Sequence, residues 1–294
     1  MSREKLALGK KKRVNGRELV KKILLSIFVV FGCFIILFPL IWMFPGAFKT
    51  KAELWGIPNT WWPRTFVHGN FQKIFETNYN GYNFKLSVLM TFIVAVATVL
   101  LNLTINLFAA FSFSTMKFRG KKFLWVYYIF TMFIPGITIL LTSLRVVSIL
   151  GMVDTIWVLI IPGLANAYNI FFFRQFFYGI PLALEEAAMI DGCSRWKIFW
   201  KVFVPMSSTP MVIIGINAFM GAWNSYIWPT LTIIDNTQFA QIYQVVRVLS
   251  TSSYAGTNYS VVIAATEVAI LIPLTLFIIF QKKIVAGISI SGLK

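Results

Sequence analysis

Long apolar segments alternate with shorter polar ones along the chain, and six of the apolar segments are long enough to cross a membrane. A helix rises 1.5 Å per residue, so roughly 20 apolar residues cross the ~30 Å hydrocarbon layer. The pattern therefore predicts an all-α polytopic membrane protein with six transmembrane helices. We place these spans at residues 24–44, 86–113, 123–144, 154–177, 209–233 and 261–280.

Two of the predicted spans contain a proline followed by a glycine. Pro135-Gly136 lies in the third span and Pro162-Gly163 in the fourth. Such pairs kink helices, and membranes tolerate kinks where neighbouring helices or a cavity satisfy the freed backbone groups. We therefore expect both spans to be bent.

Two connections are long enough to have structure of their own. Residues 50–84 contain Trp55 and Trp61-Trp62-Pro63, and because tryptophan prefers the membrane interface, we expect an external loop lying partly on it. Residues 235–259 form a second external loop whose apolar residues repeat at helical spacing. We expect this piece to rest on the membrane face or to plug the mouth of the assembly. Its apolar positions are Phe239, Ile242, Tyr243, Val246 and Leu249, with Gln241, Gln244 and Arg247 away from them.

The N-terminal residues 1–22 form a basic tail, and residues 23–294 form a single transmembrane domain. A basic start followed by an apolar run also occurs in signal peptides. Here the run 24–44 is too long for that role, and Gly46-Ala47-Phe48 is a poor cleavage site. The first span is therefore predicted to be retained.

Composition and charge agree with a membrane protein and predict its orientation. Hydrophobic residues make up 58% of the chain and the mean hydropathy is +0.75, beyond the range of soluble globular proteins. Of 27 Lys and Arg residues, 20 lie on one side of the predicted spans. The positive-inside rule then places both termini in the cytoplasm. Because topology accounts for the net charge of +17, we expect contact with membrane lipid and no nucleic-acid partner.

The sequence lacks the groups that catalysis or metal binding would need. Cys33 and Cys193 fall in different compartments and His68 is the single histidine, so no disulfide, metal site or catalytic triad is predicted. There is also no phosphate-binding GxxxxGK[ST] loop. We therefore predict that the chain is not an enzyme and has no cofactor, and that any ATP used for transport binds to another polypeptide.

A polar island interrupts the apolar pattern between the fourth and fifth spans, in the connection 178–207. Within it, residues 180–206, called the elbow below, contain three of the ten acidic residues of the chain. Pro181 suits the first turn of a helix, and Gly192 ends that helix because glycine takes left-handed backbone angles at little cost. Ser194 can cap a second helix that ends near Pro205. We predict two short helices at an angle, projecting into the cytoplasm.

The elbow has a motif. Glu186-Ala187-Ala188, three residues, Gly192, nine residues, Val202, one residue and Val204-Pro205 together resemble the coupling-loop motif of permease subunits in binding-protein-dependent ABC importers. Ile180-Pro181 and Ile190-Asp191-Gly192 resemble the sugar and oligosaccharide branch, specifically its shorter subunit related to the maltose permeases. The chain departs from the usual motif at Val202 and Val204, where the family more often has Ile and Leu.

The resemblance covers residues 20–294. Other segments that are similar to family positions are Ala109-Ala110-Phe111-Ser112-Phe113, Trp223-Asn224 and Gln281-Lys282-Lys283. Lys85-Leu86-Ser87 departs from the family, which commonly has Asn-Ser there, so the cap of the second span is not predicted.

This resemblance implies a six-span permease subunit in a bacterial cytoplasmic membrane that imports a sugar or oligosaccharide. The implied partners are a second permease subunit, two cytoplasmic ATPase subunits and an extracytoplasmic solute-binding protein. The implied ATPase-coupling residues are Glu185, Glu186, Ala187, Ala188, Asp191, Gly192, Arg195 and Pro205. Alternatives are a permease for another solute, such as a peptide, polyamine or phosphonate, and an ion-coupled secondary carrier.

Polar residues inside the spans are candidates for a substrate path, because such residues usually face a protein interior or a wet pathway. The candidates are Asn217, Asn224, Ser225, Trp228 and Glu267. For the asparagines, hydrogen bonding between helices is an equal alternative, and it is favoured for Asn102, Asn106, Asn166 and Asn169. Glu267 either lines the path or pairs with Arg247 or Arg145. Trp223 and Trp228 either stack on a sugar or anchor at the interface.

Overall fold

The structure is a computed structural model that describes residues 16–76, 78–251 and 258–291, with side chains placed as far as residue 283. Three continuous helices form its frame: α1 (Gly16–Ala47), α4 (Phe84–Thr115) and α15 (Tyr259–Ser291). Each is long and apolar enough to cross a membrane. These helices contain the first, second and sixth predicted spans, where the apolar run is not interrupted.

Short elements connect α1 to α4. Helices α2 (Lys51–Leu54) and α3 (Gly69–Glu76) are followed by the hairpin of strands β1 (Asn78–Tyr79) and β2 (Tyr82–Asn83). Asn80 and Gly81 form its turn with positive φ angles of 52° and 86°, as the tight turns of antiparallel hairpins require. Asn83 then caps α4, because its side chain accepts a hydrogen bond from the Leu86 amide. No cap was predicted for this span from the sequence, and the structure shows that Asn83 provides it.

The third predicted span, 123–144, is not one helix across the membrane. Helix α5 (Lys121–Phe130) continues into the 3₁₀ turn η1 (Thr131–Phe133), and α6 (Gly136–Ile149) then leaves at 108°. Pro135 lies at this corner, and its missing amide donor explains the break. The kink was expected, but a turn sharper than a right angle was not.

The fourth predicted span, 154–177, is also discontinuous. Only α7 (Trp157–Ile160) and α8 (Ala167–Tyr178) are helical, and Gly163 between them has a φ of 82°. Glycine reaches this angle without the clash that a Cβ atom would cause. The break at Pro162-Gly163 was expected, whereas the shortness of α7 was not.

The elbow contains α9 (Leu182–Ile190), α10 (Arg195–Ile198), the π-helical turn η2 (Phe199–Phe203) and α11 (Val204–Met206). At Ser207 the chain bends by 79° into α12 (Ser208–Trp223). The fifth predicted span, 209–233, therefore ends early at Trp223, and its last part is the separate helix α13 (Ile227–Thr232). The chain continues through the 3₁₀ turn η3 (Thr237–Phe239) and α14 (Ile242–Thr251) to α15.

The structure confirms a helical, multi-pass membrane protein but not the count of six spans. Within the described residues, three helices are long and apolar enough to cross a membrane, or five if each bent pair is counted as one span. The missing span is the fourth, because neither α7 nor α8 is long enough alone.

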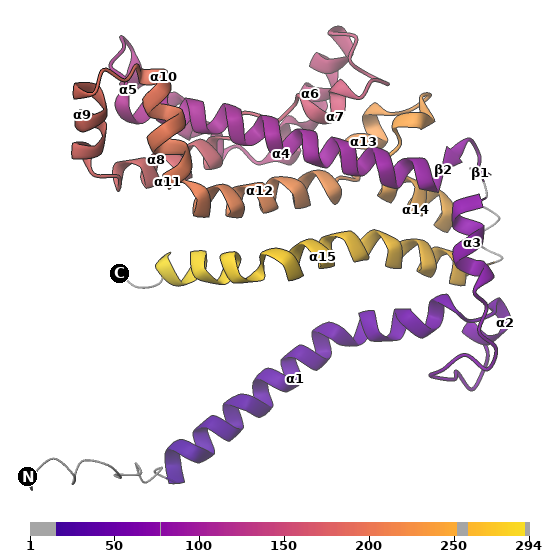
Figure 1. The fold of residues 1–294 in the computed structure, drawn as a ribbon. Helices are drawn as coiled ribbons and strands as arrows, with labels where there is room; N and C mark the ends of the chain where they lie inside the picture. Colours follow the sequence, from indigo (N-terminus) through magenta and orange to yellow (C-terminus); the bar gives the residue numbers. More distant parts are fainter. Residues whose placement is uncertain (1–15, 77, 252–257, 292–294) are drawn as a thin grey trace, which may run out of the picture.

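Helix α4 lies at the centre of the bundle. It packs along α12 and α8, and α12 also contacts α15 (Figure 1). Two apolar cores form along this axis. One, near α3 and α14, surrounds Phe84 and Trp223, and the other, near α9, surrounds Phe111 and Phe173. We call these two ends of the bundle the α3 end and the α9 end.

Helix α14 is buried in the bundle, which corrects the expectation that this amphipathic piece rests on the membrane. It packs against α4 and α15. Gln241 and Gln244 are only 1% and 5% exposed, so they do not face away from the apolar residues. Both glutamines can be buried because they form hydrogen bonds inside the bundle. The backbone N–H of Gln241 donates to the side-chain Oε1 of Gln244 at 2.8 Å, and a hydrogen-bonded polar group costs little to bury.

Candidate functional site

The elbow projects at the α9 end, beyond the end of α4 (Figure 1). Helix α9 begins after Pro181 and ends at Asp191, and Gly192 then takes a φ of 73°. The Ser194 hydroxyl accepts a hydrogen bond from the Lys197 amide and so caps α10. The two short helices predicted from the sequence are therefore present, with the predicted Ser194 cap and the predicted breaking residue Gly192, while Pro181 lies just before the first helical turn and not within it.

Glu185 holds the two arms of the elbow together. Its carboxylate pairs with the Arg195 guanidinium across the corner, and its residue exposure is only 8%. The family resemblance implied that both residues couple to an ATPase. In the structure, the Glu185 carboxylate instead forms an ion pair within the elbow. The motif could not show this, since the two neighbouring glutamates differ only in the helix face they occupy.

The outer surface of the elbow combines acidic, small and apolar groups. Glu186, Ala187 and Asp191 are exposed. Ile190 beside them is 86% exposed, and Leu182, Leu184 and Met189 of the same helix are exposed as well. Exposed apolar side chains rimmed by charge mark protein interaction surfaces. Ala188 instead packs partly against the second core, and Pro205 is exposed at the start of α11.

Aromatic packing joins the elbow to the bundle. Phe199 and Phe203 are buried against Phe111 of α4, at ring-centroid distances of 5.2 and 4.9 Å. Phe108, also on α4, stacks on Phe199 at 4.3 Å and on Trp196 at 4.8 Å. Close packing of these rings connects the elbow directly to α4.

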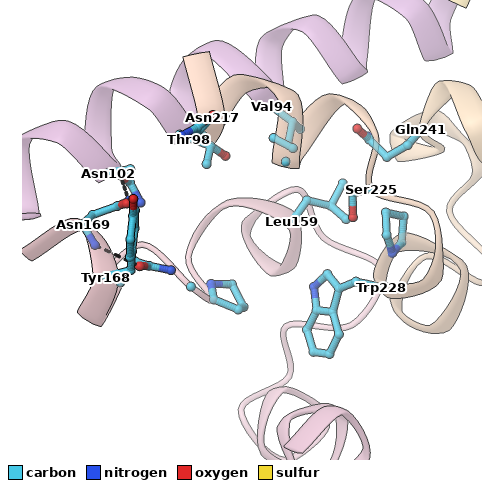
Figure 2. Close-up of a pocket in the computed structure, with 17 residues that line it drawn as sticks. Val94, Thr98, Asn102, Leu159, Tyr168, Asn169, Asn217, Ser225, Trp228 and Gln241 are labelled. Atoms are coloured by element: carbon cyan, nitrogen blue, oxygen red, sulfur yellow. Dashed lines mark hydrogen bonds between the residues drawn. The ribbon is translucent and has the colours of Figure 1, made fainter. Parts of the chain in front are cut away.

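A second candidate site is a hollow of about 440 Å³ inside the bundle. Its wall combines α4, the break between α7 and α8, and the break between α12 and α13 (Figure 2). This volume falls within the range of small-molecule sites, roughly 300–1,000 Å³. Of the five candidate path residues, Asn217, Ser225 and Trp228 line it.

The other two path candidates lie elsewhere. Asn224 accepts a hydrogen bond from the Tyr243 hydroxyl at 3.3 Å and is not part of the wall. Glu267 lies in α15, also outside the hollow. Within the described residues it forms no ion pair with Arg145 or Arg247, and its Oε1 atom is buried without a hydrogen-bond partner. The structure therefore contradicts the predicted pairing of Glu267.

Four asparagines secure one wall of the hollow. The side-chain amides of Asn102 and Asn106 both donate to the Leu164 carbonyl, at 3.0 and 2.8 Å. Asn106 Oδ1 accepts from the Asn166 amide at 2.8 Å, and Asn169 donates to Asn102 Oδ1 at 3.0 Å. These bonds satisfy the backbone of the break between α7 and α8, so the favoured prediction of helix-to-helix bonding is confirmed for Asn102, Asn106 and Asn169. The Asn166 side chain instead caps its own helix, because its Oδ1 accepts from the Asn169 amide at 3.1 Å.

The tryptophans have different environments. Trp223 is fully buried, its Nε1 donates to the Ala269 carbonyl at 3.0 Å, and its ring stacks on Phe219. It neither faces a solute nor anchors at an interface, so both predictions for Trp223 were wrong. Trp228 lines the hollow, and its Nε1 donates to the Val158 carbonyl of α7 at 2.9 Å.

Asp154 clamps α7 and α13 together near the hollow. Its Oδ1 atom accepts backbone N–H bonds from Ile234, Asp235 and Asn236, at 2.6, 3.0 and 3.2 Å. Partial burial raises the pKa of the carboxyl group, but these three donors outweigh that effect and hold the pKa below its ordinary value. This role could not be predicted from the local sequence, because the partners of Asp154 are 80 to 82 positions away.

Two polar groups in the wall were also missed. Gln241 Oε1 and Thr98 Oγ1 are buried and have no hydrogen-bond partner among the described residues. Both residues line the hollow (Figure 2). Buried polar atoms are rarely left unpaired in native structures.

Comparison with known proteins places these features in context. The family model of binding-protein-dependent transport system inner membrane components matches residues 103–289, which include the elbow and most of the wall of the hollow.

Two relatives match nearly the whole chain. The arabinooligosaccharides transport system permease protein AraQ of Halalkalibacterium halodurans is 28% identical, covering 92% of this chain and 96% of the relative. The sn-glycerol-3-phosphate transport system permease protein UgpE of Escherichia coli O6:K15:H31 is 29% identical, covering 88% and 93%.

A solved structure shows the same fold. It is a chain from the crystal structure of a bacterial ABC transporter involved in the import of the acidic polysaccharide alginate. The TM-score is 0.80 at 21% identity, covering 92% of this chain and 98% of that one.

Proposed function

The chain belongs to the family of binding-protein-dependent transport system inner membrane components, and we propose that it is the permease subunit of a bacterial ABC importer for a sugar or oligosaccharide. Two of the three proteins compared above are named for saccharides, arabinooligosaccharides and alginate. The third is named for sn-glycerol-3-phosphate, which is also a small polyol derivative.

The elbow is the observation that carries this proposal. It presents Glu186, Ala187 and Asp191 on an exposed surface, beside the apolar side chain of Ile190. One cytoplasmic ATPase subunit binds this surface, and a second ATPase subunit binds the second permease subunit. ATP binds to those subunits, and closure of the ATPases moves the elbow, which the aromatic contacts of Phe108 and Phe199 connect to α4.

Orientation follows from the same assignment. The α9 end faces the cytoplasm, together with both termini, and the α3 end faces outward, where an extracytoplasmic solute-binding protein delivers the solute. The basic clusters around residues 117–122 and 195–201 then lie on the cytoplasmic side, as the positive-inside rule requires.

The hollow is the part of the solute path that this chain supplies. Asn217, Ser225 and Trp228 line it and offer uncharged polar groups and an aromatic ring. Solute passes between this chain and the second permease subunit without covalent change. Asn224 and Glu267 lie outside the hollow and are not assigned to the path.

Uptake into proteoliposomes that contain the complete transporter tests the proposal. We expect uptake of the solute to require ATP at the α9 side and to continue when ionophores collapse the proton and sodium gradients. An ATPase partner that cannot hydrolyse ATP should abolish it. Uptake that instead follows the ion gradients and ignores ATP would mean that the chain is an ion-coupled carrier.

A further inference from the structure

We propose that Gln241 and Thr98 form a solute-binding site in the hollow that takes an uncharged, polyhydroxylated solute and disfavours an anionic one. This inference rests on the proposed function and narrows its substrate class. The proteins compared above are named for both kinds of solute, since sn-glycerol-3-phosphate and alginate are anionic and arabinooligosaccharides are neutral.

The orientation of the Gln241 amide is fixed by its neighbours. The side chain is 1% exposed, and its Nε2 atom donates to the Phe239 carbonyl at 2.9 Å. An amide group that uses its nitrogen in this way must direct its carbonyl oxygen elsewhere. Oε1 has no partner among the described residues, and Figure 2 shows it on the side of the hollow. Gln241 therefore presents a hydrogen-bond acceptor to whatever occupies the hollow.

Thr98 is an exception on its own helix. Three other threonines of α4 donate to the carbonyl four residues earlier: Thr91 to Ser87, Thr104 to Leu100 and Thr115 to Phe111. This back-bonding is the usual arrangement of threonine inside a helix. The Thr98 hydroxyl has no such bond, although it is buried and its residue lines the hollow. It remains available both to donate and to accept.

These two groups select for hydroxyl-bearing solutes. A free carbonyl oxygen accepts a hydrogen bond from a solute O–H, whereas its negative end repels a phosphate or carboxylate. The remaining polar residues of the wall are all uncharged: Asn102, Asn166, Tyr168, Asn169, Asn217 and Ser225. Trp228 has its Nε1 engaged with Val158, so only its ring is left for the apolar face of a sugar.

Uptake by the complete transporter tests this site. The probes are maltotriose and arabinotriose as neutral solutes, and sn-glycerol-3-phosphate and an alginate trisaccharide as anionic ones. We expect the wild type to take up a neutral probe in preference to both anions. Preference for an anionic probe, or failure to take up either neutral probe, would overturn the inference.

Two substitutions locate the effect. Gln241→Met and Thr98→Val keep the approximate shape of each side chain but remove its hydrogen-bonding atoms, which for Gln241 include the Nε2 donor to the Phe239 carbonyl. Loss of one hydrogen bond to a neutral solute should reduce kcat/KM for the preferred probe roughly three- to tenfold.

Matched controls make the result decisive. Thr104→Val removes an exposed, back-bonded hydroxyl from the same helix, and Gln238→Met changes an exposed glutamine of η3. Both should transport as the wild type does. If Gln241→Met and Thr98→Val match these controls while uptake stays ATP-driven, only the site proposal fails. If wild-type uptake needs no ATP, the proposed function itself fails.

Discussion

Glu185 and Glu186 are neighbours in the sequence but have opposite surroundings. Glu185 is 8% exposed and paired with Arg195, whereas Glu186 is exposed on the outer face of α9. The first therefore shapes the elbow, and the second is free to meet a partner. The sequence motif shows only that both residues are acidic. Their roles differ because Glu185 lies on the face of α9 that turns toward α10, and Glu186 does not.

Replacing Glu185 by Gln should loosen the elbow. The neutral amide cannot form the ion pair with Arg195, and a partly exposed pair of this kind contributes up to about 1 kcal/mol. Amide hydrogen exchange in residues 182–190 should become faster, measured in the membrane-inserted chain without its ATPase partners. Glu186→Gln, the matched control, should leave exchange in α9 unchanged. Equal exchange in both variants would show that the pair does not hold the arms together.

Asp154 offers a second residue-scale prediction. Asp154→Asn keeps the size of the side chain but loses the charge that attracts three backbone N–H groups, and hydrogen bonds to a charged group are each worth about 1.5–3 kcal/mol. We expect a lower melting temperature for the detergent-solubilised complex at pH 7. The neighbouring Thr155→Ala, which removes a hydroxyl bonded only to the Met152 carbonyl, serves as the control.

The same clamp predicts a pH dependence. Because the pKa of folded Asp154 lies below its ordinary value of 3.8, its stabilising effect is complete above that value and is lost as the pH falls through the folded-state pKa. The difference in melting temperature between the wild type and Asp154→Asn should therefore be constant from pH 7 to pH 5 and should shrink below about pH 4. A difference that disappears already near pH 6 would rule out this carboxylate as the cause.

At the scale of elements, the breaks in helices shape the hollow. The chain leaves helical geometry between α7 and α8 and between α12 and α13, and both breaks contribute to the wall. Inside a membrane such breaks need partners for their backbone groups. Asn106 supplies two of these at once, since it donates to the Leu164 carbonyl and accepts from the Asn166 amide.

Asn106→Leu should therefore destabilise the break between α7 and α8. The Asn166 amide would lose its acceptor, and an unpaired buried donor costs about 1–3 kcal/mol. We expect a lower melting temperature and faster hydrogen exchange in residues 161–167. Thr104→Ala, on the same helix but exposed, should change neither. An Asn106→Leu complex as stable as the wild type would mean that the asparagine network is not structural.

Hydropathy predicted those elements whose apolar runs are unbroken. Helices α1, α4 and α15 follow the predicted spans, and they stay continuous although α1 contains Pro39 and Pro45 and α15 contains Pro273. The third and fourth spans were read as kinked helices, since Pro135-Gly136 and Pro162-Gly163 signal a break but not its angle. The early end of α12 has no proline or glycine at the break, and its remaining signal was the polar pair Asn224-Ser225.

Candidate sites divide in the same way. The elbow could be predicted because its acid, glycine and proline are close together in the sequence. The hollow could be predicted only in part. Asn217, Ser225 and Trp228 belong to one predicted span, whereas Thr98 and Gln241 meet them only after the chain folds. Gln244 was assigned to the outer face because glutamine is polar. In the structure, its side-chain amide is buried and hydrogen-bonded to the backbone of Gln241 and Ile233.

At the scale of the whole molecule, α1 separates from the other helices over most of its length (Figure 1). None of its most apolar stretch is buried within the chain, and its buried residues are Pro45, Gly46 and Ala47 at its end. A helix that is apolar on all sides needs lipid or another protein around it. The described part of the chain is thus consistent with one half of a larger assembly.

The elbow is the feature on which the account depends, because it alone connects an otherwise apolar bundle to a source of energy. The most direct measurement compares the wild type with Glu186→Lys, which reverses the charge of the exposed acid at the motif position. We expect the variant to insert into the membrane normally, to lose co-purification of the ATPase partners, and to lose ATP-driven uptake. A variant that keeps its partners and transports at the wild-type rate would contradict the account.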